Sequence, residues 1–171
     1  MNKITKEQEE FLNKCTYRTW KLNTETGLVD VAGDFNCSSM GLSDFLGIEF
    51  GIIKRRFDCS HNRLVSLEGA PQKVDQVFSC SNNQLTSLEG SPKEVGWHFY
   101  CYNNKLVSLE GAPQKVLGDF ICDPINLRDL DIDLLDKIYF YNNKKYFGLK
   151  YYIITKIAKE LDPERYLKKM V

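Results

Sequence analysis

Hydrophobic and polar positions along this chain follow a pattern that repeats every 21 residues. Three blocks, 57–77, 78–98 and 99–119, align without a gap and share the pattern F-x-C-x-x-N-x-L-x-S-L-E-G. A further copy begins FICDPINLRDL at Phe120, and a degenerate earlier copy begins at Phe35, at a spacing of 22 residues. A repeat of this length is typical of solenoids, so the pattern predicts about five stacked coils.

The apolar positions of each block are expected to point into a common core, where equivalent residues of neighbouring coils stack. These positions hold Phe57, Cys59, Leu64 and Leu67; Phe78, Cys80, Leu85 and Leu88; and Phe99, Cys101, Leu106 and Leu109. Ser79 and Ser81 alternate with them and should face outward. The pattern matches the leucine-rich-repeat template, with Phe and Cys at its two strand positions. We therefore predict an α+β repeat protein, a leucine-rich-repeat solenoid with a parallel β-sheet on one face.

Polar residues recur where the chain leaves each predicted strand. Asn62, Asn83 and Asn104 occupy this place, and their amides can satisfy backbone groups that a buried turn would leave unpaired. Met40 and Ile125 replace them in the outermost coils, which are expected to be atypical. The following S-L-E-G-A/S-P segment is too short for a full helix, and its glycine and proline favour an extended return or a single tight turn.

Cysteines are as regular as the repeat itself. Five of the six share one repeat position, namely Cys37, Cys59, Cys80, Cys101 and Cys122. We interpret them as small buried apolar thiols, because no paired C-x-x-C accompanies them and parallel side chains rarely give disulfide torsion angles. Redox or metal chemistry is the alternative interpretation.

Residues 1–34 are expected to cap the first coil. Thr5 and Gln8 have the spacing of a capping box, which predicts a helix with Phe11, Leu12 and Cys15 on one face. The segment 20–31 is predicted to be a hairpin around the turn NTETG, joining the sheet edge.

The other end of the chain is predicted to be a helical cap. Segments 132–141 and 149–161 have helical spacing, and Asp162-Pro163-Glu164 is typical of a helix start. The expected organisation is therefore an N-terminal cap at 1–34, a solenoid at 35–130 and an α-helical C-terminal cap at 131–171.

Composition narrows the class of protein. Charged residues make up 27% of the chain and cancel to a net charge of zero, so there is no general electrostatic attraction to nucleic acid or membranes. The polar N-terminus does not resemble a signal peptide, and no stretch approaches the ~20 apolar residues of a membrane span. We expect a cytoplasmic protein.

Function is expected where the coils differ at outward positions. One coil holds Trp97, His98, Tyr100 and Tyr102, and two coils away the matching region holds Arg55, Arg56, Asp58 and His61. Aromatic residues and arginine are enriched at interface hot spots, so these eight residues are the predicted partner-binding surface. The alternative is that Trp97 and Tyr100 pack on adjacent loops or on the C-terminal cap, while acids such as Glu49 and Asp58 neutralise the arginines.

Sequence motifs for catalysis are missing. The chain has no glycine-rich phosphate loop, H-E-x-x-H or G-x-S-x-G, and His61 and His98 have no evident nucleophile partner. The proximity of Asp58 to His61 is consistent with two exposed polar positions. We therefore expect no enzyme activity, metal or cofactor.

The opening block TGLVDVAGDFNCSSMGLSDFLGI, followed by the F-x-C-x-x-N-x-L-x-S-L-E-G-A-P repeats, resembles the leucine-rich-repeat proteins of large tailed bacteriophages over residues 27–130. The resemblance implies a phage protein that acts in the cytoplasm of an infected bacterium. The repeat length is also similar to that of leucine-rich-repeat effectors of pathogenic bacteria, but the catalytic cysteine domain of some of those has no counterpart here.

Since we expect no enzyme activity, two other functions remain as hypotheses. The first is a non-catalytic module that binds, and inhibits or redirects, a bacterial host protein, in its concrete form a component of a defence system. The second is binding of nucleic acid or nucleotides through Arg55, Arg56 and the aromatic residues, or through the lysine-rich segment 141–171. A homodimer through the tyrosine-rich C-terminal cap or a sheet edge is a further expectation.

Overall fold

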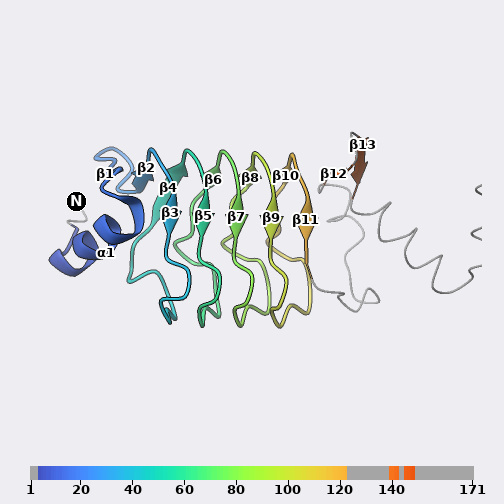
Figure 1. Cartoon of the computed structure of the whole chain (residues 1–171), viewed down its shortest axis with the longest axis horizontal. Helices are drawn as coiled ribbons and strands as arrows, with labels where there is room; N and C mark the ends of the chain where they lie inside the picture. Colours follow the sequence, from blue (N-terminus) through green and yellow to red (C-terminus); the bar gives the residue numbers. More distant parts are fainter. Residues whose placement is uncertain (1–3, 123–138, 143–144, 149–171) are drawn as a thin grey trace, which may run out of the picture.

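The chain forms a β-solenoid of about four turns (Figure 1). The computed structural model describes residues 4–122, 139–142 and 145–148. Turns begin at Phe35, Phe57, Phe78 and Phe99, and Phe120 opens a further coil. The predicted solenoid and its 21-residue period are confirmed.

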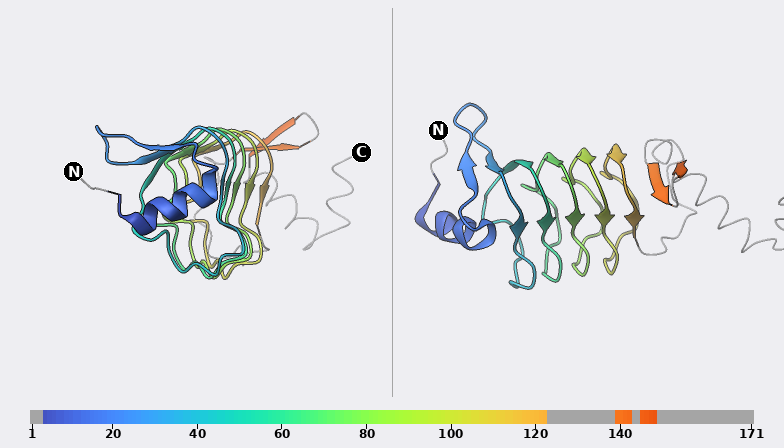
Figure 2. Two further views of the ribbon diagram at one scale, coloured as in Figure 1. Left: turned by 60° about the vertical axis from the view of Figure 1, so that its left-hand side comes forward. Right: turned by 45° about the horizontal axis from the view of Figure 1, so that its top comes forward.

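Two sheets line the solenoid, and the coils superimpose when viewed along its axis (Figure 2). The five-stranded sheet has the order β11-β9-β7-β5-β3 and is parallel throughout. Its strands are β3 (Phe35–Asn36), β5 (Phe57–Asp58), β7 (Phe78–Ser79), β9 (Phe99–Tyr100) and β11 (Phe120–Ile121). Each strand pairs with the equivalent residues of the next coil, so residues at one repeat position form a row across the sheet.

The six-stranded sheet has the order β1-β2-β4-β6-β8-β10, and only its β1–β2 pair is antiparallel. Its strands are β1 (Trp20–Leu22), β2 (Val29–Val31), β4 (Phe50–Ile53), β6 (Lys73–Val74), β8 (Glu94–Val95) and β10 (Lys115–Val116). The expectation of a sheet on one face was therefore incomplete. Val74, Val95 and Val116 are buried while the residues before them are exposed, which is the alternation that a second sheet requires.

A tight turn joins the two sheets in each coil, as the sequence predicted. In the third coil the carbonyl of Leu88 accepts a hydrogen bond from the N–H of Ser91 at 2.9 Å. Gly90 lies within this turn at φ +84°, a conformation that side chains with a Cβ rarely adopt. The turn is followed in this coil by Glu94–Val95, which pairs in register with Lys73–Val74 and Lys115–Val116 of the neighbouring coils.

The core is built from the predicted rows. Phe35, Phe57, Phe78, Phe99 and Phe120 form a continuous ring stack, with neighbouring centroids 4.7 to 5.5 Å apart. The thiols of Cys37, Cys59, Cys80 and Cys101 are buried beside this stack, as predicted. Desolvation by burial raises the pKa of the Cys37, Cys59 and Cys80 thiols, so these groups are held in the neutral form.

The asparagine row satisfies backbone groups, which confirms its predicted role. The Asn83 side chain donates to the carbonyls of Cys59 and Cys80, both at 3.0 Å, and accepts from the N–H of Leu64 at 3.0 Å. Asn62 and Asn104 make equivalent bonds in their own coils. Each amide therefore ties two coils together.

Helix α1 (Lys6–Thr16) and the β1–β2 hairpin lie at the N-terminal end of the solenoid (Figure 2). Thr5 and Gln8 form the predicted capping box, and Phe11, Leu12 and Cys15 are buried. The Gln8 side chain also donates to the carbonyl of Leu46 at 2.9 Å, which fixes the helix on the first coil. The predicted helix and hairpin are confirmed.

The described part of the C-terminal region is a hairpin. Strands β12 (Tyr139–Asn142) and β13 (Lys145–Gly148) pair in antiparallel register. The helix predicted over 132–141 is therefore wrong at its end, where the consecutive aromatic residues Tyr139, Phe140 and Tyr141 favour a strand. The predicted helices at 149–161 and from Asp162 lie outside the described residues, as does Ile125.

Candidate interaction surface

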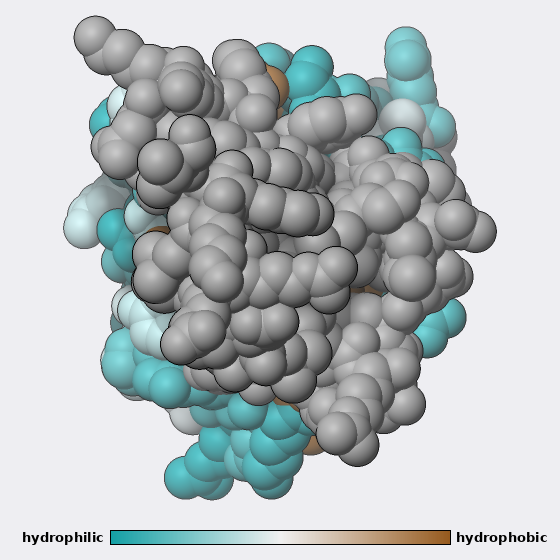
Figure 3. Space-filling model, turned by 90° about the vertical axis from the view of Figure 1, so that its right-hand side faces the viewer, coloured by the Kyte–Doolittle hydropathy of each residue, from teal (hydrophilic) through white to brown (hydrophobic). Residues whose placement is uncertain are grey.

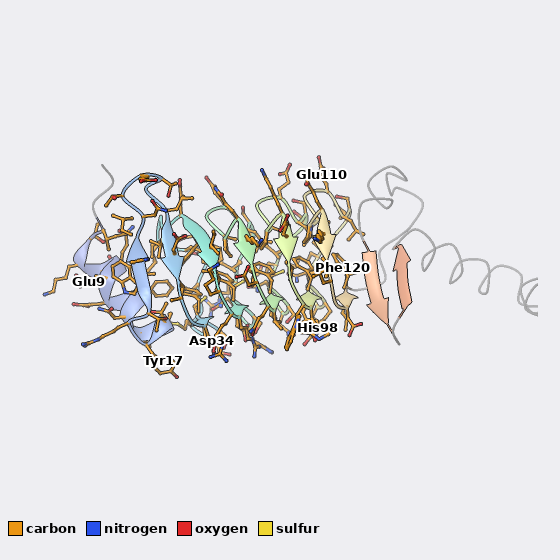
Figure 4. The ribbon with its side chains drawn as sticks, turned by 90° about the horizontal axis from the view of Figure 1, so that it is seen from above. Glu9, Tyr17, Asp34, His98, Glu110 and Phe120 are labelled. Atoms are coloured by element: carbon orange, nitrogen blue, oxygen red, sulfur yellow. The ribbon has the colours of Figure 1, made fainter. Side chains whose placement is uncertain are left out.

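Four predicted residues form a continuous outward surface on the coil that begins at Phe99, which we call the aromatic row: Trp97, His98, Tyr100 and Tyr102. Trp97 is 57% exposed and Tyr102 is 37% exposed, while His98 and Tyr100 are half-buried. Trp97 is therefore exposed and Tyr100 is not, while the C-terminal cap, on which the alternative interpretation packs both residues, lies mostly outside the described residues. Figure 4 shows that His98 lies on the same side of the solenoid as Asp34, whereas Glu110 lies on the opposite side.

The rings of the aromatic row pack on one another. His98 and Tyr100 stack with centroids 5.7 Å apart and ring planes 11° apart. Tyr102 meets Tyr100 edge-on at 6.4 Å, and Trp97 lies 6.4 Å from His98. Because each ring restricts its neighbour, the row presents a preorganised apolar surface.

His98 is fixed by the next coil. Its Nδ1 accepts a hydrogen bond from the backbone N–H of Asp119 at 3.0 Å, and the Asp119 carboxylate lies 3.3 Å from the same nitrogen. The half-buried His98 therefore has a structural role between coils as well as a place in the aromatic row.

Ser79 and Ser81 occupy the outward positions beside the aromatic row, but they are only 4% and 2% exposed. Their hydroxyls lie 3.2 Å apart. On the flanking strands, Asp58 and Tyr100 occupy the register position of Ser79. Arg56 lies near enough to Tyr100 to counteract part of the rise in the tyrosine pKa that desolvation and Asp119 cause.

The predicted arginines are both paired with acids. Arg56 contacts the buried carboxylate of Asp58, which also accepts from the N–H and hydroxyl of Ser60. The Nε of Arg55 lies 3.5 Å from the Asp34 carboxylate. The expected neutralisation by Asp58 is confirmed, but the second acid is Asp34 and not Glu49.

His61 is set apart from Asp58. It adopts φ +56° at the end of its strand, and its Nε2 lies 3.3 Å from the side-chain amide of Asn82. Asn82 accepts in turn from Asn103 at 2.9 Å. His61 therefore belongs to a polar row at the strand ends.

Sequence reasoning missed three residues that adjoin the aromatic row, namely Leu117, Asp119 and Ile121. Ile121 follows Tyr100 in the sheet register, and Asp119 follows His98. Leu117 and Ile121 are exposed, so the apolar surface continues into the coil that Phe120 opens. Comparing equivalent repeat positions one coil further along would have found them.

Metal binding and membrane spanning were also considered for the described part of the chain. No group of three or more His, Cys, Asp or Glu side chains could hold a metal ion among residues 4–122 and the β12–β13 hairpin. None of the helices in those ranges has the length and apolar character needed to cross a membrane. Seen from the β11 end of the solenoid, the visible described residues are mostly hydrophilic (Figure 3).

Comparisons with protein-family models, with curated proteins and with solved structures give no match. The assignment of the fold therefore rests on the strand register, the stacked core and the repeat itself.

Proposed function

We propose that this chain is a non-catalytic protein-binding module whose aromatic row is the centre of the interface. The observation that carries the proposal is the exposure of Trp97 and Tyr102 on a rigid sheet, in a coil whose neighbour has Gln76, Val77, Ser79 and Ser81 at the positions that match the aromatic row. Aromatic anchors on preorganised elements are the usual hot spots of protein interfaces. Leu117 and Ile121 extend the apolar area.

The charge pattern favours a protein over a nucleic acid. Phosphate recognition needs basic groups that are free to replace counterions. Arg55 and Arg56 are each paired with an aspartate, and Lys54 is paired with Asp75 at 3.2 Å. The basic segment 141–171, the other predicted nucleic-acid surface, lies outside the described residues except for the two hairpin strands.

The cysteines and histidines support a non-catalytic role. A thiol acts as a nucleophile only as the thiolate, and burial raises the pKa of the Cys15 thiol to about 11. The thiols of Cys37, Cys59 and Cys80 are shifted in the same direction. His61 contacts Asn82 and His98 contacts Asp119, and neither histidine has a nucleophile beside it among its described contacts.

We assign the module to the leucine-rich-repeat proteins of large tailed bacteriophages, on the strength of the opening block and the repeats. In this setting it acts in the cytoplasm of an infected bacterium and inhibits or redirects a host protein, in the most specific form a component of a defence system.

The test is affinity capture from a nuclease-treated lysate of a bacterial host. Wild type is compared with a Trp97→Ala/Tyr100→Ala variant, and with a Tyr17→Ala/Val107→Ala control that removes exposed apolar side chains elsewhere. Circular dichroism checks that all three are folded. Proteins captured by wild type and the control but lost by the aromatic variant support the proposal; recovery of nucleic acid from untreated lysate, without such a protein, overturns it.

A further inference from the structure

Asp119 differs from the other acids around the aromatic row. Asp34, Asp58, Asp75 and Glu94 each lie within ion-pair distance of a lysine or arginine among the described residues. Among the described residues Asp119 lies within ion-pair distance of His98 and of no lysine or arginine, and its side chain is 41% exposed. An exposed carboxylate without a lysine or arginine partner in that part of the chain therefore adjoins the aromatic row.

His98 is the basic side chain that the structure places beside this carboxylate, and its Nδ1 also accepts the backbone N–H of Asp119. The carboxylate lies 3.3 Å from that nitrogen. The charge of Asp119 acts on Tyr100 as well, where it adds to the rise in pKa caused by desolvation.

Aromatic faces beside an exposed carboxylate are suited to a cation. Ring quadrupoles attract a guanidinium or ammonium group that lies over the ring, and a neighbouring carboxylate adds a charge-assisted hydrogen bond. Arginine suits such a site better than lysine, because its planar guanidinium can stack on a ring and pair with a carboxylate at once.

We propose that the partner places an arginine side chain over the rings of the aromatic row, where its guanidinium pairs with the exposed carboxylate of Asp119. The proposal rests on the protein-binding function above and names the chemistry of its central contact. It also explains why Arg55 and Arg56 are held by aspartates, since unpaired arginines would repel the incoming cation. The rest of the interface is then formed by apolar contacts to Trp97, Leu117 and Ile121.

The first test uses small probes and needs no partner. N-acetyl-arginine methylamide is titrated into the full chain, and chemical shifts of the Trp97 indole, His98 ring and Asp119 amide are followed by NMR. N-acetyl-citrulline methylamide is the neutral control of equal shape. We expect saturable shifts with the arginine probe and shifts at least about tenfold weaker with citrulline or with Asp119→Asn protein. Equal shifts with both probes, or none at these residues, overturn the proposal.

The second test separates this inference from the proposed function. Capture of host proteins is compared for wild type, Asp119→Asn, the Trp97→Ala/Tyr100→Ala variant and Asp75→Asn, which removes a carboxylate already paired with Lys54. Loss of captured protein in Asp119→Asn and in Trp97→Ala/Tyr100→Ala, but not in Asp75→Asn, supports the inference. Loss in the aromatic variant with full retention in Asp119→Asn overturns the arginine contact and leaves the protein-binding function intact. Retention in every variant overturns the function itself.

Discussion

Asparagine, rather than another polar residue, suits the row at the strand ends because its amide donates and accepts at once. Asn83 donates to two carbonyls and accepts from one N–H, and no water is needed at the buried site. Aspartate could not donate, and serine is too short to span the two coils. The hydrogen bonds at this repeat position therefore favour asparagine.

Asn83→Ala is expected to lower the free energy of unfolding by about 2–3 kcal/mol, because it leaves the buried N–H of Leu64 and two carbonyls without that partner. The control is Asn82→Gly, at the adjacent residue, which has φ +56°. This change should alter the free energy of unfolding by less than about 1 kcal/mol. Denaturant unfolding of the two variants checks the difference. Equal losses would contradict the role assigned to Asn83.

The buried thiols predict a loss of stability at high pH. The folded-state pKa of Cys80 is raised above its ordinary value of 9.0, so its contribution is fully present below pH 9.0 and is lost as the pH rises above it. In that range the free energy of unfolding should fall by about 1.4 kcal/mol per pH unit for each such thiol. Cys80→Ala should therefore be destabilised relative to wild type at pH 7, with the gap narrowing between pH 9 and 10.5. A constant gap would show that the thiol is not held neutral.

The inward residues could be predicted from sequence because their periodicity reflects burial directly. Phe78 and Cys80 are buried as expected. The burial of the outward-facing Ser79 and Ser81 could not be predicted, because it depends on the neighbouring coils, in which Asp58 and Tyr100 hold the register position of Ser79. The pairing of Arg55 with Asp34 likewise required the register across coils.

At the scale of elements, α1 acts as a lid on the first coil. Leu12 is completely buried, and Phe11 packs edge-on against Phe35 with centroids 5.9 Å apart. The helix therefore replaces the coil that the first turn lacks on its N-terminal side.

Leu12→Ala should reduce the free energy of unfolding by about 2–5 kcal/mol, through the lost apolar burial and the cavity left behind. Glu9→Ala, at an exposed position of the same helix, is the control and should change it by less than about 0.5 kcal/mol. Thermal unfolding measured in parallel distinguishes them. A Leu12→Ala protein as stable as the control would mean that α1 does not cover the core.

The second sheet was beyond sequence reasoning because its strands lie in the return segment, which the sequence indicated only as an extended return or a tight turn. The strands β6, β8 and β10 each contain two residues, and only their position after the tight turn brings them into register. The N-terminal helix was predictable because its capping box and apolar face are local signals.

At the scale of the whole molecule, each coil contacts only its neighbours, so one repeat should be removable. Deleting residues 57–77 joins Arg56 to Phe78 and places Phe35 against Phe78, with every row kept in register. The shortened chain should fold, with the same circular dichroism per residue and a lower midpoint of unfolding, because one interface between coils is gone. Deleting residues 57–67 removes half a coil and should prevent folding. If both deletions fold equally well, the coils are not stacked in this register.

The position of the aromatic row was predictable at this scale, because it is the place where one coil departs from the repeat. Its electrostatics were not, since the contacts of Arg55 with Asp34 and of Asp119 with His98 are made between coils.

The most direct test of the account is site-specific photo-crosslinking in bacterial cells. Tyr102→p-benzoylphenylalanine places the crosslinker on the aromatic row, and Val107→p-benzoylphenylalanine places it at an exposed residue just past the polar row at the strand ends. The account predicts a discrete protein adduct from position 102 that position 107 does not give. Adducts of equal yield from both positions, or an adduct from position 107 alone, would contradict the assignment of the aromatic row as the interface.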